Sequence, residues 1–131
     1  MPFDSPHNSL FGDLEILRSA RSSIDGKGHW LKYGFRDGDR LCLVAALSVA
    51  AESPGFRNPN RTERRLARVL AAQLPPNAPL LARIRVYPSR RRLMSFNDST
   101  RTRHEDVLAV YDRAIESVTH KTAEFSFVRV V

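Results

Sequence analysis

The sequence has almost no cysteine and no long apolar run. Cys42 is the one cysteine among 131 residues, which excludes an intramolecular disulfide and a zinc site built on paired cysteines. The longest nearly uncharged apolar run, residues 41–51, is about half the ~20 residues that a membrane-spanning helix needs. The N-terminal residues also lack the basic and apolar regions of a signal peptide. We therefore expect a cytoplasmic protein with no membrane contact.

Motifs for nucleotide binding and hydrolysis are missing as well. The chain contains no G-x-x-x-x-G-K-[ST], no G-x-G-x-x-G and no G-x-S-x-G. Its four histidines show neither H-x-H nor H-x-x-x-H spacing: His7, His29, His104 and His120. The sequence thus predicts no metal and no cofactor, and it favours a non-enzymatic protein over an enzyme.

The overall amino-acid composition is that of a globular domain. Hydrophobic residues make up 42% and charged residues 27%, close to the average for folded proteins. A chain of this length buries enough surface to fold without a metal or a disulfide. We expect a flexible N-terminal arm over residues 1–9 and a single globular domain over residues 10–131.

Positive charge is concentrated in the middle of the chain. The formal net charge is +7, and residues 57–103 hold 12 arginines against two acids, Glu63 and Asp98, a local charge of +10. Such a concentration indicates a surface for a polyanion, above all nucleic acid, or for an acidic protein. A solvated helix face followed by a basic loop would produce the same pattern.

The arginines have helical spacing. Residues 61–74 are predicted to form a helix that starts at an Asn60–Glu63 capping box and ends at Pro75. One face of this helix is basic and the opposite face carries Leu66 and Leu70. The predicted anion-binding residues are Arg61, Arg64, Arg65, Arg68, Arg90, Arg91 and Arg92. Tyr87 and Phe96 are nearby aromatic residues that we expect to stack on bases.

The predicted fold is α+β and mainly helical, with about four helices packed on a small antiparallel sheet. Besides the helix over 61–74, helices are expected over 10–23, over the apolar stretch that follows Cys42, and over 103–118, the last opened by a Thr102–Glu105 capping box. Alternating apolar residues predict strands over 80–87 and 122–131 that pair with each other. A turn at residues 36–39 favours a hairpin between 31–35 and 40–43, with a loop as the alternative. The stretch at 90–96 fits either a helical turn or a strand.

Cys42 is predicted to be buried and unreactive, because it opens a helix that is apolar on every side. One alternative is a small thiol-dependent enzyme in which His29 or His104 activates Cys42. Another is a self-associating structural module, a homo-oligomer paired through the edge of the C-terminal strand. The sequence does not distinguish the oligomeric states.

Asn97 and Asp98 precede the last predicted helix. Side chains of this type commonly bond nearby backbone amides and fix a turn. The alternative is a polar pocket in which Asn97 and Asp98 face Trp30 and Arg113.

Several short motifs resemble one family of small uncharacterised bacterial proteins, mostly actinobacterial and phage proteins. They are Trp30 after a glycine-rich stretch, Cys42 opening CLVAAL, FND at 96–98, and RTRHEDVL followed by DRAI at 112–115. The family pattern has tryptophan where this chain has Phe96, and Pro-Gly where Ser-Thr-Arg follows Asp98. The resemblance covers about residues 14–118 and implies no activity, substrate or cofactor. It does imply a polar cluster that clamps one end of a helical core: Trp30, Cys42, Asn97, Asp98, Asp112 and Arg113.

Overall fold

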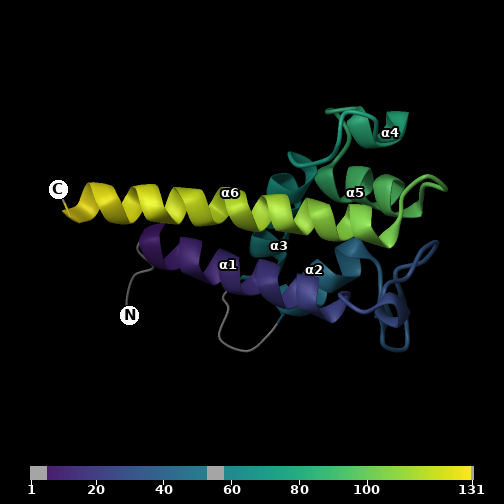
Figure 1. Ribbon diagram of the computed structural model, residues 1–131, viewed down its shortest axis with the longest axis horizontal. Helices are drawn as coiled ribbons and strands as arrows, with labels where there is room; N and C mark the ends of the chain where they lie inside the picture. Colours follow the sequence, from purple (N-terminus) through teal and green to yellow (C-terminus); the bar gives the residue numbers. More distant parts are fainter. Residues whose placement is uncertain (1–5, 53–57, 131) are drawn as a thin grey trace.

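The fold is built along its C-terminal helix. The computed structural model describes residues 6–52 and 58–130, and the side chains of 12–26, 28–52 and 58–122. Helix α6 (His104–Val130) spans the molecule, and α1 (Pro6–Ser23) lies antiparallel beside it (Figure 1). Leu17 of α1 and Val110 of α6 belong to the same buried core. Two amphipathic helices thus bury their apolar faces against each other.

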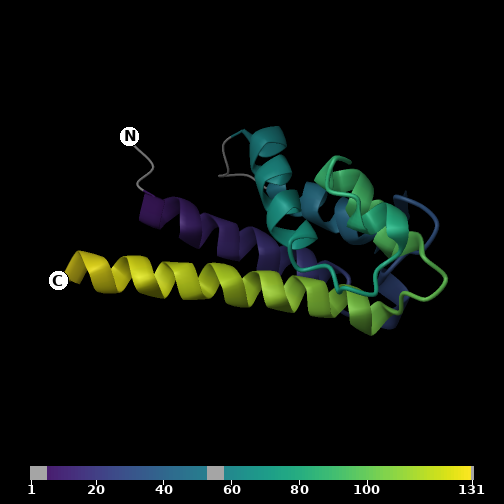
Figure 2. The ribbon, with the colours of Figure 1, turned by 90° about the horizontal axis from the view of Figure 1, so that it is seen from above.

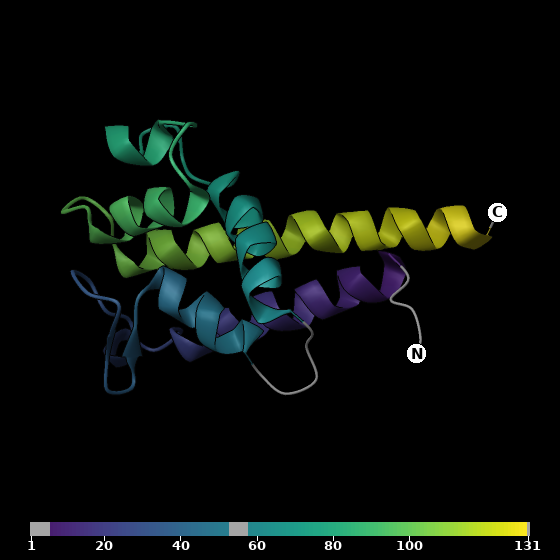
Figure 3. The same cartoon turned by 180° about the vertical axis from the view of Figure 1, so that it is seen from behind.

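Helix α2 (Leu43–Ala51) is the centre of the core. Its residues are apolar nearly all round, and it packs against α1, α3 (Pro59–Ala71) and α5 (Ser89–Asp98). Helix α3 crosses α6, as Figures 2 and 3 show from above and from behind. The short α4 (Leu80–Arg83) packs on α5. The buried apolar helix that the sequence predicts after Cys42 is confirmed.

A small hairpin follows the 3-10 turn η1 (Lys27–His29). Strands β1 (Arg36–Asp37) and β2 (Arg40–Leu41) pair antiparallel, with Gly38 between them at φ +62°. Only glycine adopts this left-handed conformation without strain. The predicted hairpin therefore exists, but its first strand lies later in the chain than residues 31–35.

The protein is mainly helical with a small antiparallel sheet, as predicted, but the described residues form six α-helices instead of four. Helix α1 starts at Pro6, so residues 6–9 of the expected arm are helical, while residues 1–5 lie outside the described residues. The ambiguous stretch at 90–96 is part of α5.

The predicted strand over 80–87 is wrong. Pro79 precedes α4, and a turn follows Ile84. The alternation that suggested a strand does not match burial, since Ala82 is buried whereas Val86 is 87% exposed. Four prolines in this region fix the backbone and remove amide donors that a sheet would need: Pro75, Pro76, Pro79 and Pro88.

The predicted strand over 122–131 is also wrong, because α6 continues to Val130. Residue 131 lies outside the described residues. Thr122 donates its hydroxyl to the Val118 carbonyl one turn earlier. Extending an existing helix costs far less than starting a new element, and the described residues contain no strand outside the β1–β2 hairpin to pair with. The alternative of a homo-oligomer therefore lacks the C-terminal strand edge through which two chains would pair.

Neither capping box forms at the residues that the sequence predicted. Asn60 lies inside α3, which begins at Pro59 after Asn58 at φ +48°. Helix α6 begins at His104, so Arg103, rather than Thr102, is the capping residue. Its amide donates to Asp106 Oδ2 at 2.8 Å, whereas Glu105 is exposed. The reciprocal carboxylate is thus one residue later than the sequence pattern indicated.

Candidate functional site

A buried asparagine is the centre of a polar cluster at one end of the core. Asn97, near the end of α5, is fully buried. Its Oδ1 accepts hydrogen bonds from Trp30 Nε1 at 2.8 Å and from the Leu43 amide at 3.1 Å. Its Nδ2 donates to the Leu31 carbonyl and to Asp98 Oδ1, both at 3.0 Å. All four hydrogen-bonding positions of the amide are therefore used.

Asp98 extends this cluster into the loop that precedes the hairpin. Its Oδ1 also accepts a hydrogen bond from the Tyr33 amide at 2.9 Å. Tyr33 has φ +65°, a conformation that is unusual for a residue with a side chain and that the bond to Asp98 supports. The prediction that these two side chains only fix a local turn is wrong, since they bond to residues more than 60 positions away.

Cys42 is the last residue of the cluster and caps the N-terminus of α2. It is fully buried, as predicted. Its Sγ accepts a hydrogen bond from the Ala45 amide at 3.3 Å and donates to Met94 Sδ at 3.6 Å. Burial raises the pKa of the thiol above its ordinary value. The protonated, inert form is thus favoured.

His104, one of the two histidines that the alternative of a thiol-dependent enzyme would use, has another role. The His104 ring stacks on the Trp30 indole with centroids 5.5 Å apart, and its Nε2 contacts the Ile24 carbonyl at 2.5 Å. Lys32 Nζ lies over the same indole and donates to the Thr102 carbonyl at 2.6 Å. No contact between Cys42 and a histidine exists in the described part of the chain. The geometry gives no support to a thiol enzyme.

The two remaining residues of the predicted cluster lie elsewhere. Asp112 forms an ion pair with Arg21 of α1, and Arg113 donates to the Gln73 carbonyl after α3. The pair with Asp112 raises the pKa of Arg21. The structure therefore brings together Trp30, Cys42, Asn97 and Asp98, which we call the clamp. Asp112 and Arg113 instead hold α6 to its neighbours.

Four of the seven predicted anion-binding arginines pair within the described protein or lie apart from the cavity that the others line. Arg65 forms an ion pair with the buried Asp13 of α1, and Arg92 donates to the Ala82 carbonyl at 2.8 Å. Arg91 lies over the Tyr87 ring. Arg61 is exposed near the start of α3.

The other three predicted arginines share one cavity. Arg64 and Arg68 of α3 and Arg90 of α5 line a cavity of about 460 Å³ between these helices, which we call the arginine groove. Its other lining residues are Val44, Asn60, Glu63, Ala67, Pro88 and Ser89. Two segments more than 20 residues apart in sequence thus present their positive charge to one space.

Glu63 is the acid of the arginine groove. Its Oε2 lies 3.8 Å from Arg90 Nη1, at the limit of an ion pair, and its Oε1 is buried with no hydrogen-bond partner in the described structure. Arg64 and Arg68 form no ion pair with a carboxylate of the described residues. The groove therefore has a positive excess.

The aromatic residue beside the groove is one that the sequence did not indicate. The Arg90 guanidinium lies 5.3 Å from the centre of the Phe35 ring, and Phe35 is 40% exposed. The predicted stacking residue Phe96 is buried, so that prediction is wrong. Tyr87 is partly exposed beside Arg91. Phe35 comes next to the predicted turn at 36–39, but that turn does not show which helix the hairpin meets.

These features define a small helical protein with a polar clamp and an arginine groove. Residues 12–117 match the family of unknown function DUF6197, and the chain belongs to this family. Comparison with curated proteins and with solved structures yields no match. None of the described helices is long and apolar enough to cross a membrane. The described residues contain no group of three or more histidine, cysteine or acidic side chains placed to hold a metal ion.

Proposed function

We propose that this protein is a cytoplasmic, non-enzymatic accessory protein that binds single-stranded nucleic acid through the arginine groove. The observation that carries the proposal is that Arg64, Arg68 and Arg90 come from two helices and line one cavity. Guanidinium groups bind phosphate oxygens through a planar fork of donors and tolerate partial loss of water. A row of them can follow a phosphate backbone.

The geometry of α3 suits a chain of phosphates. Arg64 and Arg68 are one helical turn apart, about 6 Å along the axis, and both are exposed. Neither is neutralised by a carboxylate of the described residues. Arg61 lies one turn earlier on the same helix and continues the row. Glu63, which faces Arg90, reduces the total charge but leaves an excess.

Exposed aromatic rings near the arginine groove favour the binding of single-stranded over double-stranded nucleic acid. Phe35 lies beside Arg90, and Tyr33 is more exposed still, at 65%. Bases that are not paired can stack on such rings whatever their sequence, whereas a duplex hides its base faces. The groove thus combines a backbone-binding row with a ring on which a base can stack.

The test is fluorescence anisotropy of the full chain with a labelled oligothymidylate of 15–20 nucleotides, titrated at several salt concentrations. We expect a Kd of about 10⁻⁴ to 10⁻⁶ M at physiological salt and a log affinity that falls linearly with log salt. The double variant Arg64→Ala, Arg68→Ala should flatten that slope by roughly one to two units. Lys121→Ala on the distant part of α6 removes one exposed charge and should leave binding nearly unchanged.

Two further measurements distinguish the partner. Phe35→Ala should weaken binding of the single strand and leave binding of a duplex of the same length unchanged. Polyglutamate of equal charge should compete poorly. Absence of binding at low salt, equal losses in the Lys121 variant, or stronger competition by polyglutamate would each overturn the proposal, the last in favour of an acidic protein partner.

A further inference from the structure

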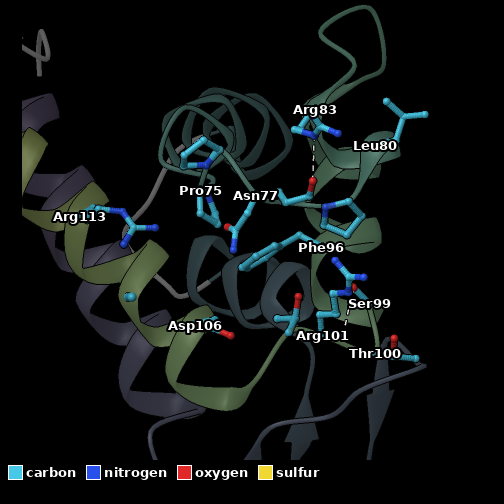
Figure 4. A pocket seen from close by; sticks show the side chains of 15 residues that line it. Pro75, Asn77, Leu80, Arg83, Phe96, Ser99, Thr100, Arg101, Asp106 and Arg113 are labelled. Carbon is cyan, nitrogen blue, oxygen red and sulfur yellow. Dashed lines mark hydrogen bonds between the residues drawn. The ribbon is translucent and has the colours of Figure 1, made fainter.

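A second and larger cavity shares no residue with the arginine groove. It has a volume of about 610 Å³ and lies between residues 75–80, the end of α5 with the loop that follows it, and the first turns of α6 (Figure 4). We propose that it binds a small organic phosphate that also carries hydroxyl or amino groups, as a nucleoside phosphate or a sugar phosphate does. This site goes beyond the nucleic-acid surface proposed above and is independent of it.

Three arginines from separate segments line this cavity: Arg83 of α4, Arg101 of the loop after α5, and Arg113 of α6. In the view of Figure 4, Arg113 lies on one side and Arg83 and Arg101 on the other. Asp106 is the one acid among the lining residues, so the lining has a charge of about +2. This positive charge is about equal in size and opposite in sign to the charge of a phosphate monoester near neutral pH.

The main chain positions two of these guanidinium groups. Arg83 Nε donates to the Ala78 carbonyl at 2.9 Å, and Arg113 donates to the Gln73 carbonyl through Nε and Nη2. Each group keeps further N–H donors, and no described carboxylate forms an ion pair with any of the three arginines. Arginines held in place by carbonyl groups lose less side-chain freedom when an anion binds.

The size and the other walls indicate an organic ligand. A cavity of this volume is in the range of metabolite-binding pockets, and a free phosphate ion would fill only a small part of it. Leu80 provides exposed apolar surface, while Asn77, Ser99 and Thr100 provide neutral polar groups. A ring or a sugar attached to the phosphate can occupy this remaining space.

Asp106 sets a further requirement on the ligand. Its Oδ2 accepts the Arg103 amide, which fixes the carboxylate at the start of α6. Its Oδ1 has no hydrogen-bond partner in the described part of the chain. A carboxylate in this place only accepts hydrogen bonds, so it favours a ligand that carries a hydroxyl or amino donor at some distance from its phosphate.

The experiment is isothermal titration calorimetry of the full chain with four probes: adenosine monophosphate, ribose 5-phosphate, inorganic phosphate and adenosine. We expect adenosine monophosphate or ribose 5-phosphate to bind with a Kd of about 1 mM or tighter, at least about tenfold tighter than inorganic phosphate or adenosine. Which of the first two binds tighter distinguishes a nucleoside phosphate from a sugar phosphate.

Variants show whether the binding takes place in this cavity. The exposed Arg101 side chain forms no hydrogen bond or ion pair with the rest of the described protein, so Arg101→Ala should fold normally and weaken binding about tenfold or more. Arg101→Lys should recover part of the loss. The matched control, Arg64→Ala in the arginine groove, should bind the probe as the unchanged protein does.

The proposal is overturned if neither organic phosphate binds with a Kd of about 1 mM or tighter, if inorganic phosphate or adenosine binds equally tightly, or if Arg101→Ala leaves the Kd unchanged. Because Arg64 and Arg68 do not line this cavity, oligonucleotide binding can fail while this site persists, and the reverse also holds.

Discussion

The indole nitrogen of Trp30 donates a hydrogen bond to Asn97 Oδ1 at 2.8 Å, which joins the loop before the hairpin to the end of α5. Cys42 continues this connection, because its amide donates to the Phe35 carbonyl at 3.1 Å. The clamp therefore holds the hairpin where Phe35 meets Arg90. The clamp thus fixes the position of Phe35 beside the arginine groove.

Asn97→Ala should destabilise the protein by about 3–5 kcal/mol. The change removes the partners of the Trp30 indole, the Leu43 amide and the Leu31 carbonyl, and each buried group left without a partner costs about 1–3 kcal/mol. Asp98→Asn keeps an oxygen that can accept from the Tyr33 amide and should cost about 1 kcal/mol or less. Urea denaturation measures both. A loss for Asn97→Ala no larger than that for Asp98→Asn would contradict the central place of Asn97.

Cys42 should react very slowly with a thiol reagent in the native protein, because it is buried and its pKa is raised. Cys42→Ala should cost about 1–2 kcal/mol, since the Ala45 amide loses its acceptor at the start of α2. Cys42→Ser keeps a capping oxygen and should be less destabilising than the alanine variant. Thiol labelling as fast as in the unfolded chain would contradict the burial of Cys42. An alanine variant more stable than the serine variant would show that the thiol does not cap the helix.

Alkaline pH should destabilise the protein partly through Tyr111. Its hydroxyl donates to the Leu43 carbonyl at 2.7 Å, and burial raises the pKa of the phenol well above its ordinary value of 10.0. Above that value the unfolded phenol ionises and the folded one does not, so stability falls by about 1.4 kcal/mol per pH unit. Tyr111→Phe has no phenol to ionise. The difference in free energy of unfolding between the unchanged protein and this variant should therefore narrow as pH rises above 10. Parallel stability curves would refute the assignment.

Arg65 and Arg64 should differ in their effect on stability although they are neighbours. Arg65 pairs with Asp13, which is 7% exposed, whereas Arg64 is exposed and lines the groove. Arg65→Ala leaves a buried carboxylate without its partner and should cost about 1–2 kcal/mol, less than for a fully buried pair because Arg65 is partly exposed. Arg64→Ala should change stability by no more than about 0.5 kcal/mol. Thermal unfolding of the two variants checks this difference.

The same pair gives a pH dependence with a defined direction. Burial raises the pKa of Asp13 above its ordinary value of 3.8, and Arg65 acts in the opposite direction without cancelling the effect. In Arg65→Ala the carboxyl should bind a proton more readily still. The stability deficit of that variant should therefore shrink as pH falls toward the pKa of Asp13, a trend that urea denaturation at several pH values measures. A deficit that grows on acidification would contradict this account.

Periodicity predicted the helices well where it reflects one buried face. The face of α6 that carries Val107, Val110, Tyr111, Ala114 and Val118 is buried as expected, and so is the leucine face of α3. The strands failed because alternation over a few residues does not show whether a partner strand exists. For residues 80–87 the prolines decided the backbone, and for the C-terminal residues the preceding helix did.

The candidate site shows the same limit. The family pattern grouped Trp30, Cys42, Asn97 and Asp98, which the structure brings together through long-range contacts, with two residues that lie elsewhere. Helical spacing placed Arg64 and Arg65 together on one face, but it could not show that α1 brings Asp13 to Arg65 alone. The contact between Phe35 and Arg90 depends on how the hairpin docks on α5, which no local pattern encodes.

The antiparallel packing of α1 and α6 has a practical consequence. The first turn of α1 and the last turn of α6 lie at one end of the molecule, and the hairpin, α4 and α5 lie toward the other (Figure 1). A fluorophore attached at the first turn of α1 or at the last turn of α6 would lie far from the cavity that Arg83, Arg101 and Arg113 line. A dye pair attached at both extremities would report separation of α1 from α6 by energy transfer.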